Sequence, residues 1–274
     1  MTLLSIVWDV PKGITLGSFE LRFYSLMFAL AYILGYQIMK KIFIDEKIKQ
    51  EYLDSLFMYS MLSMIVGARL GHVFFYDWDY YSQNLSEIYK IWHGGLASHG
   101  AAIAMILTFI YYSKKVIKMP PLWLLDRMSL TVALAGFFIR TGNLMNSEII
   151  GKATDLPWAF VFVNAHVADP MTPRHPSQIY EALGYLLTFA ILWFLFWKTD
   201  KKKYLGYIFG VFLAMLWSVR FLVEFVKENQ EAFEDSMTFN MGQLLSIPLI
   251  LIGIYLIYSS KNRFFENGKK AQTK

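Results

Sequence analysis

The sequence contains no cysteine, which excludes disulfide bonds, thiolate metal sites and a cysteine nucleophile. The motifs of several common enzyme classes are missing as well. There is no HxxxH, HExxH or paired-carboxylate spacing for a metal, no GxSxG nucleophile elbow and no phosphate-cradling glycine loop. We therefore expect neither a bound metal nor a cofactor.

Charged residues are scarce. They make up 17% of the 274 residues, against about 25% in a typical protein, whereas 56% of the residues are apolar and 18% aromatic. This composition excludes a disordered chain and indicates one integral membrane domain over residues 1–274. The net charge of +5 does not indicate nucleic-acid binding, because the basic residues fall in short clusters between apolar runs. The N-terminus lacks the features of a cleaved signal peptide, so we expect none.

Seven apolar segments approach the ~20 residues that a bilayer requires. They cover residues 20–39, 54–76, 95–113, 121–144, 177–198, 204–226 and 240–259. The connections after the first, third and fifth segments and the C-terminal tail are basic, whereas the alternate connections are neutral or acidic. The positive-inside rule then places the N-terminus outside and the C-terminus in the cytoplasm. We predict an all-α polytopic fold with seven transmembrane helices. No internal repeat is evident, which weakens a secondary-transporter interpretation.

The most informative stretch is residues 136–151, GFFIRTGNLMNSEIIG. Charged groups at membrane depth cost roughly 2.5–3.5 kcal/mol each on insertion scales, so they are usually paired and functional. Arg140, Asn143 and Asn146 follow one another at intervals of three residues and share one stripe of a helix, with Glu148 just beyond. Such a group can bind a phosphate or another anionic head group. The alternative is an interhelical ion pair of Arg140 and Glu148 that only holds the bundle together.

Polar residues from six of the seven segments gather near the predicted outer face. They are Arg22, Tyr24, Arg69, His72, His99, Arg140 to Glu148, Arg174 to Glu181, Arg220 and Glu224. The inner halves of the segments carry almost none. A transporter or channel for an anionic solute needs polar residues through the full membrane depth, so it is the weaker alternative. A non-catalytic lipid-binding scaffold is a third interpretation.

Several of these residues have two interpretations. The Arg69 guanidinium either clamps a phosphate or pairs with a glutamate. His99, whose unperturbed imidazole titrates near pH ~6.5, is either a general base or a packing residue. Arg220 and Glu224 are spaced i, i+4, which often produces an intrahelical ion pair.

The stretch PRHPSQIYEAL is typical of a turn followed by a helix start. Pro176 suits the first turn, and we expect Ser177 or His175 to cap the helix. Glu181 then faces inward one turn later.

Taken together, these segments resemble the prolipoprotein diacylglyceryl transferase family. RTGNLMNSEIIG is similar to the signature of that family, with Ile139 in place of a glycine and Leu144 in place of a phenylalanine. The resemblance continues, in the family's order, through LRFYSLMFA, GARLGHVFFY, GGLASHGA, PRHPSQIYEAL, VRFLVEF and MGQLLSIP, and it covers most of the chain. Two further departures are Leu216, where the family commonly has tyrosine, and Lys227, where it has arginine.

The resemblance implies transfer of the diacylglyceryl group of phosphatidylglycerol to the lipobox cysteine thiol of a prolipoprotein. A thioether forms and glycerol 1-phosphate leaves, as the first step of bacterial lipoprotein maturation. The resemblance also implies a multi-pass protein of the bacterial inner membrane with its site toward the outer leaflet, no cofactor and no nucleic-acid partner. The residues implied as catalytic are His99, Arg140 and Arg220. The residues implied as substrate-binding are Tyr24, Arg69, Asn143, Asn146, Glu148, Gly151 and Glu224. Either His99 or an arginine-stabilised thiolate would activate the thiol, and the sequence leaves both open.

Overall fold

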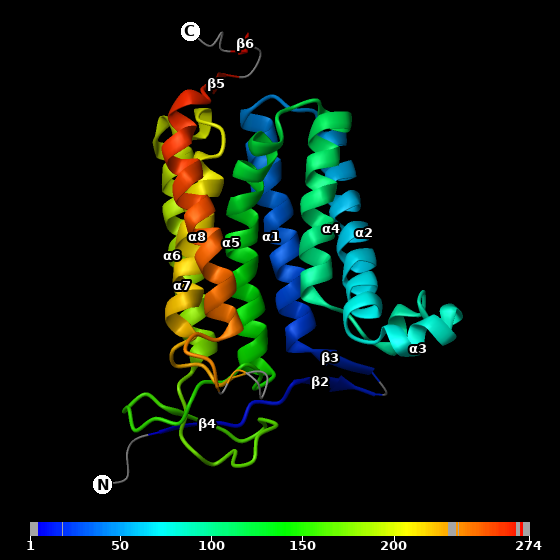
Figure 1. The fold of residues 1–274 in the computed structure, drawn as a ribbon, viewed down its shortest axis with the longest axis vertical. Coiled ribbons are helices and arrows are strands. Elements are labelled where there is room, and N and C mark those ends of the chain that lie inside the picture. Colours follow the sequence, from blue (N-terminus) through cyan, green and yellow to red (C-terminus); the bar gives the residue numbers. More distant parts are fainter. Residues whose placement is uncertain (1–4, 18, 230–233, 235, 267–268, 271–274) are drawn as a thin grey trace. The chain divides into compact units, whose positions relative to one another are not determined.

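The computed structural model describes residues 5–17, 19–229, 234, 236–266 and 269–270. The chain forms two compact units. Unit 1 combines Met1–Ile38 with Asp126–Lys274, and unit 2 is Met39–Leu125. Helices dominate both units (Figure 1).

The helices are α1 (Phe23–Asp45), α2 (Gln50–Phe75), α3 (Trp78–Gln83), α4 (Ser98–Tyr111) with its π-helical extension η3 (Tyr112–Ile117), α5 (Pro121–Met145), α6 (Ser177–Lys198), α7 (Tyr207–Val223) and α8 (Met241–Ser259). Six of these helices in the described part of the chain are long and apolar enough to cross a membrane, and α7 is a shorter apolar helix of 17 residues. The predicted all-α polytopic fold is confirmed. α7 is shorter than the predicted segment 204–226 because the chain enters it through Gly206 at a left-handed φ of 84° and leaves the helix after Val223.

In unit 2, α2 and α4 pack closely at glycines. A Cβ on Gly71 would lie 2.6 Å from the Cα of Gly100, and a Cβ on Gly67 would lie 2.7 Å from the Gly100 carbonyl oxygen. Small residues at a crossing let two helix backbones approach each other, which favours helix association within a membrane. The glycines of GARLG and SHGA therefore serve as a packing interface.

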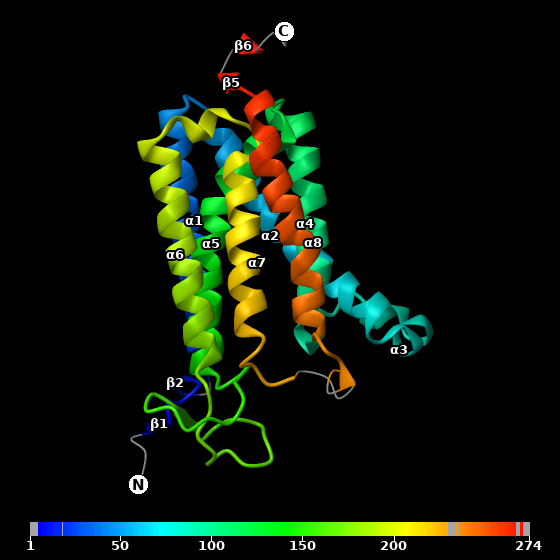
Figure 2. The ribbon, with the colours of Figure 1, turned by 60° about the vertical axis from the view of Figure 1, so that its left-hand side comes forward.

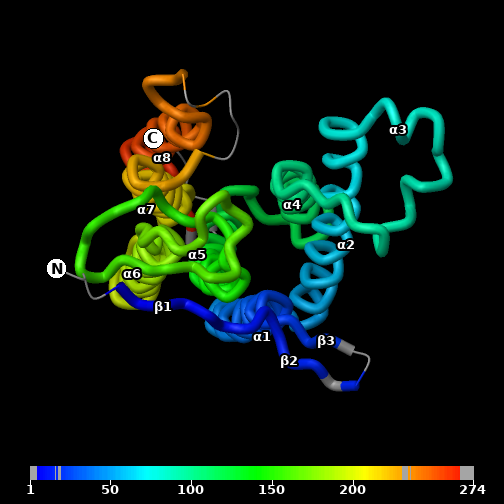
Figure 3. Tube along the Cα trace, turned by 90° about the horizontal axis from the view of Figure 1, so that it is seen from below, coloured from blue at the N-terminus to red at the C-terminus, as the bar shows by residue number. Residues whose placement is uncertain are grey.

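In unit 1, α7 lies between α6 and α8 (Figures 2 and 3). α7 and α8 approach at Gly210 and Gly253, where a Cβ on Gly253 would lie 2.7 Å from the Gly210 carbonyl oxygen. α6 meets α7 where Gly184 faces the side chain of Val219. α5 ends, α6 begins, α7 ends and α8 begins at the same end of this bundle (Figure 1). Polar residues close to these four helix ends are therefore brought together.

The strands are short. β1 (Ile6–Trp8) pairs in parallel with β4 (Phe160–Phe162), β2 (Gly13–Leu16) pairs antiparallel with β3 (Phe19–Arg22), and β5 (Phe265–Glu266) pairs antiparallel with β6 (Lys269–Lys270). Beside β1 and β4, an apolar cluster of Leu144, Ile150, Phe160 and Phe162 packs against Trp8. The Trp8 indole also donates to the Leu144 carbonyl at 3.0 Å. This cluster ties the N-terminal segment and the α5–α6 loop to the end of α5.

Candidate active site

The last turn of α5 closes with a left-handed residue. Ser147 has a φ of 55°, its N–H donates to the Leu144 carbonyl, and the Glu148 N–H donates to the Asn143 carbonyl, both at 3.0 Å. These two bonds make a Schellman motif, which satisfies the free carbonyls of a helix end. The motif folds Glu148 back over α5, where its carboxylate accepts from Nδ2 of Asn143 at 3.3 Å and Nδ2 of Asn146 at 3.1 Å. Asn143 and Asn146 of the predicted stripe thus form one hydrogen-bonded group with Glu148, which lies just beyond it.

Arg140 joins this group to α6. Its Nη1 donates to Oδ1 of Asn143 at 3.1 Å, and its Nε lies 2.7 Å from Oε2 of Glu181. Glu181 is fully buried, and its Oε1 accepts from the Tyr185 hydroxyl at 3.3 Å. Among the described residues, the carboxylate partner of Arg140 is thus Glu181 and not the Glu148 that the sequence suggested. Arg140 is also hydrogen-bonded to Tyr185. A guanidinium has five N–H donors, more than these three contacts require.

Tyr24 lies at the start of α1, beside the Arg140 group. Its ring packs onto Gly142 of α5, where a Cβ would lie 2.8 Å from the ring. Its phenol also interacts electrostatically with the charged groups of Arg140 and Glu148. A glycine at position 142 is therefore what lets the tyrosine come this near to α5.

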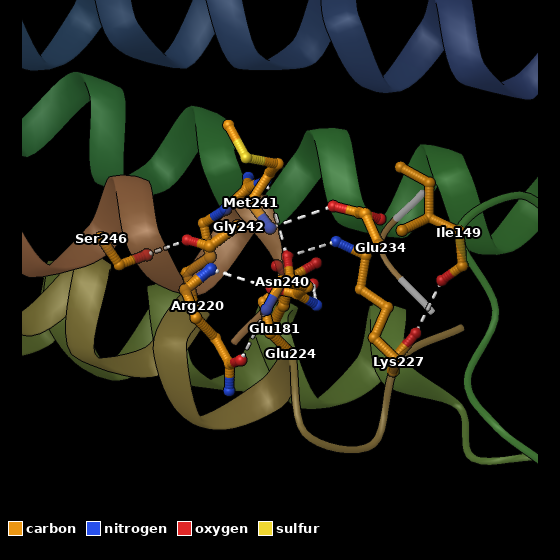
Figure 4. A network of polar contacts seen from close by, with 12 residues as sticks. Ile149, Glu181, Arg220, Glu224, Lys227, Glu234, Asn240, Met241, Gly242 and Ser246 are labelled. Atoms are coloured by element: carbon orange, nitrogen blue, oxygen red, sulfur yellow. Dashed lines mark hydrogen bonds and ion pairs between the residues drawn. The ribbon is translucent and has the colours of Figure 1, made fainter. Parts of the chain in front are cut away.

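A second polar network joins the end of α7 to the start of α8 (Figure 4). Glu224 is 4% exposed, and its carboxylate accepts from Lys227 Nζ at 2.6 Å and from Asn240 Nδ2 at 2.9 Å. Arg220 Nη2 is farther away, at 3.6 Å from Glu224. The i, i+4 pair is therefore present, but Lys227 makes the closer contact. Arg220 Nε is buried and has no partner among the described residues. Gly242 makes room for this network, since a Cβ there would lie 2.5 Å from the Glu224 carboxyl group.

Gly151 lies where three backbone segments meet. Its N–H donates to the His175 carbonyl at 3.0 Å, and it forms an isolated antiparallel bridge with Lys227. Next to it, the Lys152 N–H donates to the Val226 carbonyl at 2.8 Å. A Cβ on Gly151 would lie 2.6 Å from the His175 carbonyl oxygen and 2.7 Å from that of Val226. Gly151 thus joins the α5–α6 loop to the segment that carries Lys227.

Arg69 and His99 belong to unit 2. Arg69 is 3% exposed, and its guanidinium lies 4.9 Å from the ring centre of Tyr81. It donates at 2.5 to 3.2 Å to the backbone carbonyls of Glu87, Ile88, Gly94 and Gly95. In this position Arg69 organises the connection between α3 and α4. His99 is the second residue of α4 and is exposed within unit 2. Its role as a base stays a prediction.

The family profile described as prolipoprotein diacylglyceryl transferase matches residues 11–259. The chain belongs to this family. It is similar to the phosphatidylglycerol–prolipoprotein diacylglyceryl transferase of Porphyromonas gingivalis, with 45% identity over 264 residues that cover 92% of this chain and 93% of the relative. The enzymes of the same name from Chloroherpeton thalassium and Tolumonas auensis are each 41% identical over 256 residues, covering 93% of this chain and 94% and 97% of the relatives. Membership of this transferase family does not favour the alternative of an anion transporter or channel.

In this member of the transferase family, one local prediction is wrong. Pro176 occupies the N-cap position of α6, and no side chain caps the helix there. Ser177 does not cap its own helix, because its hydroxyl instead donates to the Ile149 carbonyl at 2.6 Å. The proline dihedral angles of φ −78° and ψ 68° start the helix without a side-chain cap.

The sequence predicted that Glu181 faces inward, as it does, but named no partner for it, and it did not single out Asn240. A glutamate within an apolar segment does predict a buried partner, but the sequence does not say which one. Asn240 followed by Gln243 is a capping-box pattern, and both bonds of the box are present at the start of α8. The bond from Asn240 to Glu224 joins residues of two different elements, and no local pattern reveals it.

Proposed function

We propose that this protein transfers the diacylglyceryl group of phosphatidylglycerol to the lipobox cysteine of a prolipoprotein. The thiol sulfur attacks the glycerol carbon that is esterified to phosphate, a C–S bond forms, and the C–O bond to phosphate breaks. The thiol proton passes to a base, and glycerol 1-phosphate leaves. The leaving phosphate gains negative charge during this step, so cationic donors that face it lower the barrier.

The observation that carries the proposal is that buried polar atoms at one end of unit 1 lack hydrogen-bond partners among the described residues. Arg220 Nε and Asn146 Oδ1 are both buried and have no partner in the described part of the chain. Arg140 has five N–H donors, more than its contacts with Glu181, Asn143 and Tyr185 require. Buried polar groups are nearly always paired, so unpaired ones point to a missing ligand. A phosphate with glycerol hydroxyl groups supplies both acceptors for the arginines and donors for the asparagine.

The remaining residues take supporting roles in this proposal. Glu148 fixes Asn143 and Asn146, Tyr24 borders the head group, and Glu224 holds the α7 end that carries Arg220. Gly151 keeps the adjoining loop in place, and Arg69 shapes the connection that leads to His99. A free thiol of pKa ~8.5 is mostly protonated at neutral pH, so the transfer needs a base or a cationic neighbour of the sulfur. His99 as the base and an arginine-stabilised thiolate both remain candidates for this step.

The site is proposed to face the outer leaflet of the bacterial inner membrane. In unit 1, the basic turn η4 (Asp200–Lys203) follows the end of α6 that lies away from the site. Lysine-rich connections stay in the cytoplasm. Arg140 in the last turns of α5 and Arg220 in the last turn of α7 lie at the opposite end of the bundle (Figure 1). In this orientation they reach the leaflet in which a prolipoprotein signal peptide presents its cysteine.

The test is a transfer assay with purified protein, phosphatidylglycerol vesicles and a synthetic lipobox peptide. We expect the peptide to gain the mass of one diacylglyceryl unit. Vesicles of phosphatidylethanolamine and a peptide with serine in place of the cysteine are the matched controls. Folded protein that leaves the peptide mass unchanged, or that only binds the lipid, would overturn the proposal.

A further inference from the structure

A strained backbone follows the end of α5. Ile149 has a φ of 56°, only two residues after Ser147 at 55°. The left-handed region is unfavourable for an L-residue, and especially so for one with a β-branched side chain. Strain of this kind persists only where the surrounding structure enforces it, and it is concentrated at functional sites. Glu148 lies between the two strained residues.

The first turn of α6 supplies that enforcement. Ser177 Oγ donates to the Ile149 carbonyl, and Gln178 Nε2 donates to the Glu148 carbonyl, each at 2.6 Å. Both side chains are fully buried. Their two bonds hold successive carbonyls of the strained turn in one orientation.

The geometry points to Ser177 and Gln178 as positioning residues for the transfer reaction, an inference that rests on the proposed function. They keep the turn in the conformation in which the Glu148 carboxylate reaches Asn143 and Asn146. Asn143 in turn accepts from Arg140. The first turn of α6 thus sets the arrangement of the phosphate-binding group before lipid arrives.

A purely structural role for these two side chains fits the contacts less well. Serine at a helix start usually bonds its own helix, yet the Ser177 hydroxyl reaches out to the α5–α6 turn. The Gln178 Nε2 donates to the Glu148 carbonyl of the turn, while its Oε1 is buried without a partner in the described part of the chain. Packing alone would be served equally well by an apolar side chain of similar size.

Positioning makes a specific kinetic prediction. In Gln178→Ala the turn relaxes and only a fraction of the molecules is competent to bind lipid, so the apparent affinity falls by that fraction. Leaving a buried carbonyl unpaired changes the equilibrium constant between the competent and the relaxed turn by roughly tenfold to a hundredfold. We expect KM for phosphatidylglycerol in mixed micelles to rise by about this factor, while kcat at saturating lipid stays near the wild-type value. Ser177→Ala should behave in the same way.

A second substitution tests whether the strained turn is the cause. Glycine adopts a positive φ without cost, so Ile149→Gly removes the need for enforcement. We expect Ile149→Gly alone to be nearly as active as the wild type, and the double variant Gln178→Ala/Ile149→Gly to recover most of the lost KM. A loss of folded protein would instead lower kcat at unchanged KM, and glycine at 149 would worsen it.

Thr188→Ala is the matched control, because Thr188 is a fully buried residue of α6 whose hydroxyl donates to the Gly184 carbonyl, in the backbone of its own helix, at 2.8 Å. It should leave KM unchanged. The inference fails if Gln178→Ala and Ser177→Ala keep the wild-type KM, or if Ile149→Gly gives no recovery. Wild-type protein that is inactive in the same assay would instead overturn the proposed function.

Discussion

Removal of the Arg140 side chain is expected to affect stability as well as chemistry. Glu181 is fully buried, and the Arg140 Nε lies 2.7 Å from its carboxylate. Arg140→Ala leaves the buried Glu181 carboxylate without its cation. Breaking a buried ion pair in this way typically lowers the free energy of unfolding by about 3–5 kcal/mol. This is a large share of the about 5–15 kcal/mol by which folded proteins are stable. An inactive Arg140→Ala variant therefore does not by itself assign Arg140 to the phosphate.

The double variant Arg140→Ala/Glu181→Gln separates the two effects. Glutamine has nearly the shape of glutamate and still accepts from the Tyr185 hydroxyl, but it leaves no buried charge. We expect the double variant to regain most of the about 3–5 kcal/mol. Transfer should nevertheless stay at least about 100-fold below wild type, because the loss of one donor to a developing oxyanion costs about 10²–10³ in rate.

Two measurements on each variant decide the matter: thermal unfolding in detergent followed by tryptophan fluorescence, and the peptide mass-gain assay. Glu181→Gln alone is the control for chemistry, because it removes the same carboxylate but keeps the Arg140 guanidinium, which can donate to the amide oxygen. Its Tm is expected to fall, since Arg140 loses its counter-ion, but the folded protein should retain transfer. A double variant that melts no higher than Arg140→Ala would refute the argument from buried charge. A double variant that transfers at near the wild-type rate would refute the assignment of Arg140 to the phosphate.

Three further predictions concern the surroundings of this group. Gly151→Ala should lower the free energy of unfolding by about 1–3 kcal/mol through overpacking against two backbone carbonyls, measured by thermal unfolding, and should reduce transfer. Lys227→Met should reduce transfer about tenfold, because Arg220 is then drawn into a closer ion pair with Glu224, whereas Lys227→Arg should stay near wild type in the same mass-gain assay. Burial lowers the pKa of His175 below its usual 6.5. The folded protein therefore keeps His175 neutral, its contribution to stability is complete above pH 6.5, and that contribution is lost as the pH falls toward the lowered pKa. His175→Gln should remove this part of the pH dependence of Tm.

Gly35→Ala provides the control for Gly151→Ala. Gly35 lies within α1, and a Cβ there would meet Thr131 at 3.5 Å, an ordinary van der Waals contact. It should leave both Tm and transfer close to wild type. If Gly151→Ala were equally harmless, the close backbone crossing would not be what requires glycine at that position.

Hydrophobic runs were enough to predict the long apolar helices. The predicted segment 177–198 agrees with α6 at both ends, and segment 121–144 differs from α5 by one residue. Spacing on one helix also predicted that Asn143, Asn146 and Glu148 lie together, because a helical repeat and its C-terminal turn are local features. Local patterns were least reliable at helix starts, where Pro176 replaced the predicted side-chain cap of α6.

Contacts between elements were not predictable. Arg140 pairs with Glu181 across a gap of 41 residues, and nothing in one sequence distinguishes that carboxylate from Glu148. The same holds for Arg69, because its acceptors are backbone carbonyls and every residue carries one. Side-chain types show that a buried charge needs a partner, but the tertiary fold chooses the partner.

Lys227, which stands where the family has arginine, shows which cation of the second polar network neutralises Glu224. Lys227 is buried and lies 2.6 Å from Glu224, whereas Arg220 is 29% exposed and 3.6 Å away. Neutralising one carboxylate requires only a compact point charge, which lysine supplies as well as arginine does. Binding a phosphate through two parallel bonds requires a guanidinium fork, which lysine lacks. Because Lys227 makes the closer ion pair with Glu224, the Arg220 guanidinium is left with the longer 3.6 Å contact with that carboxylate. Arginine at 220 is therefore expected to be irreplaceable by lysine, while position 227 accepts either residue.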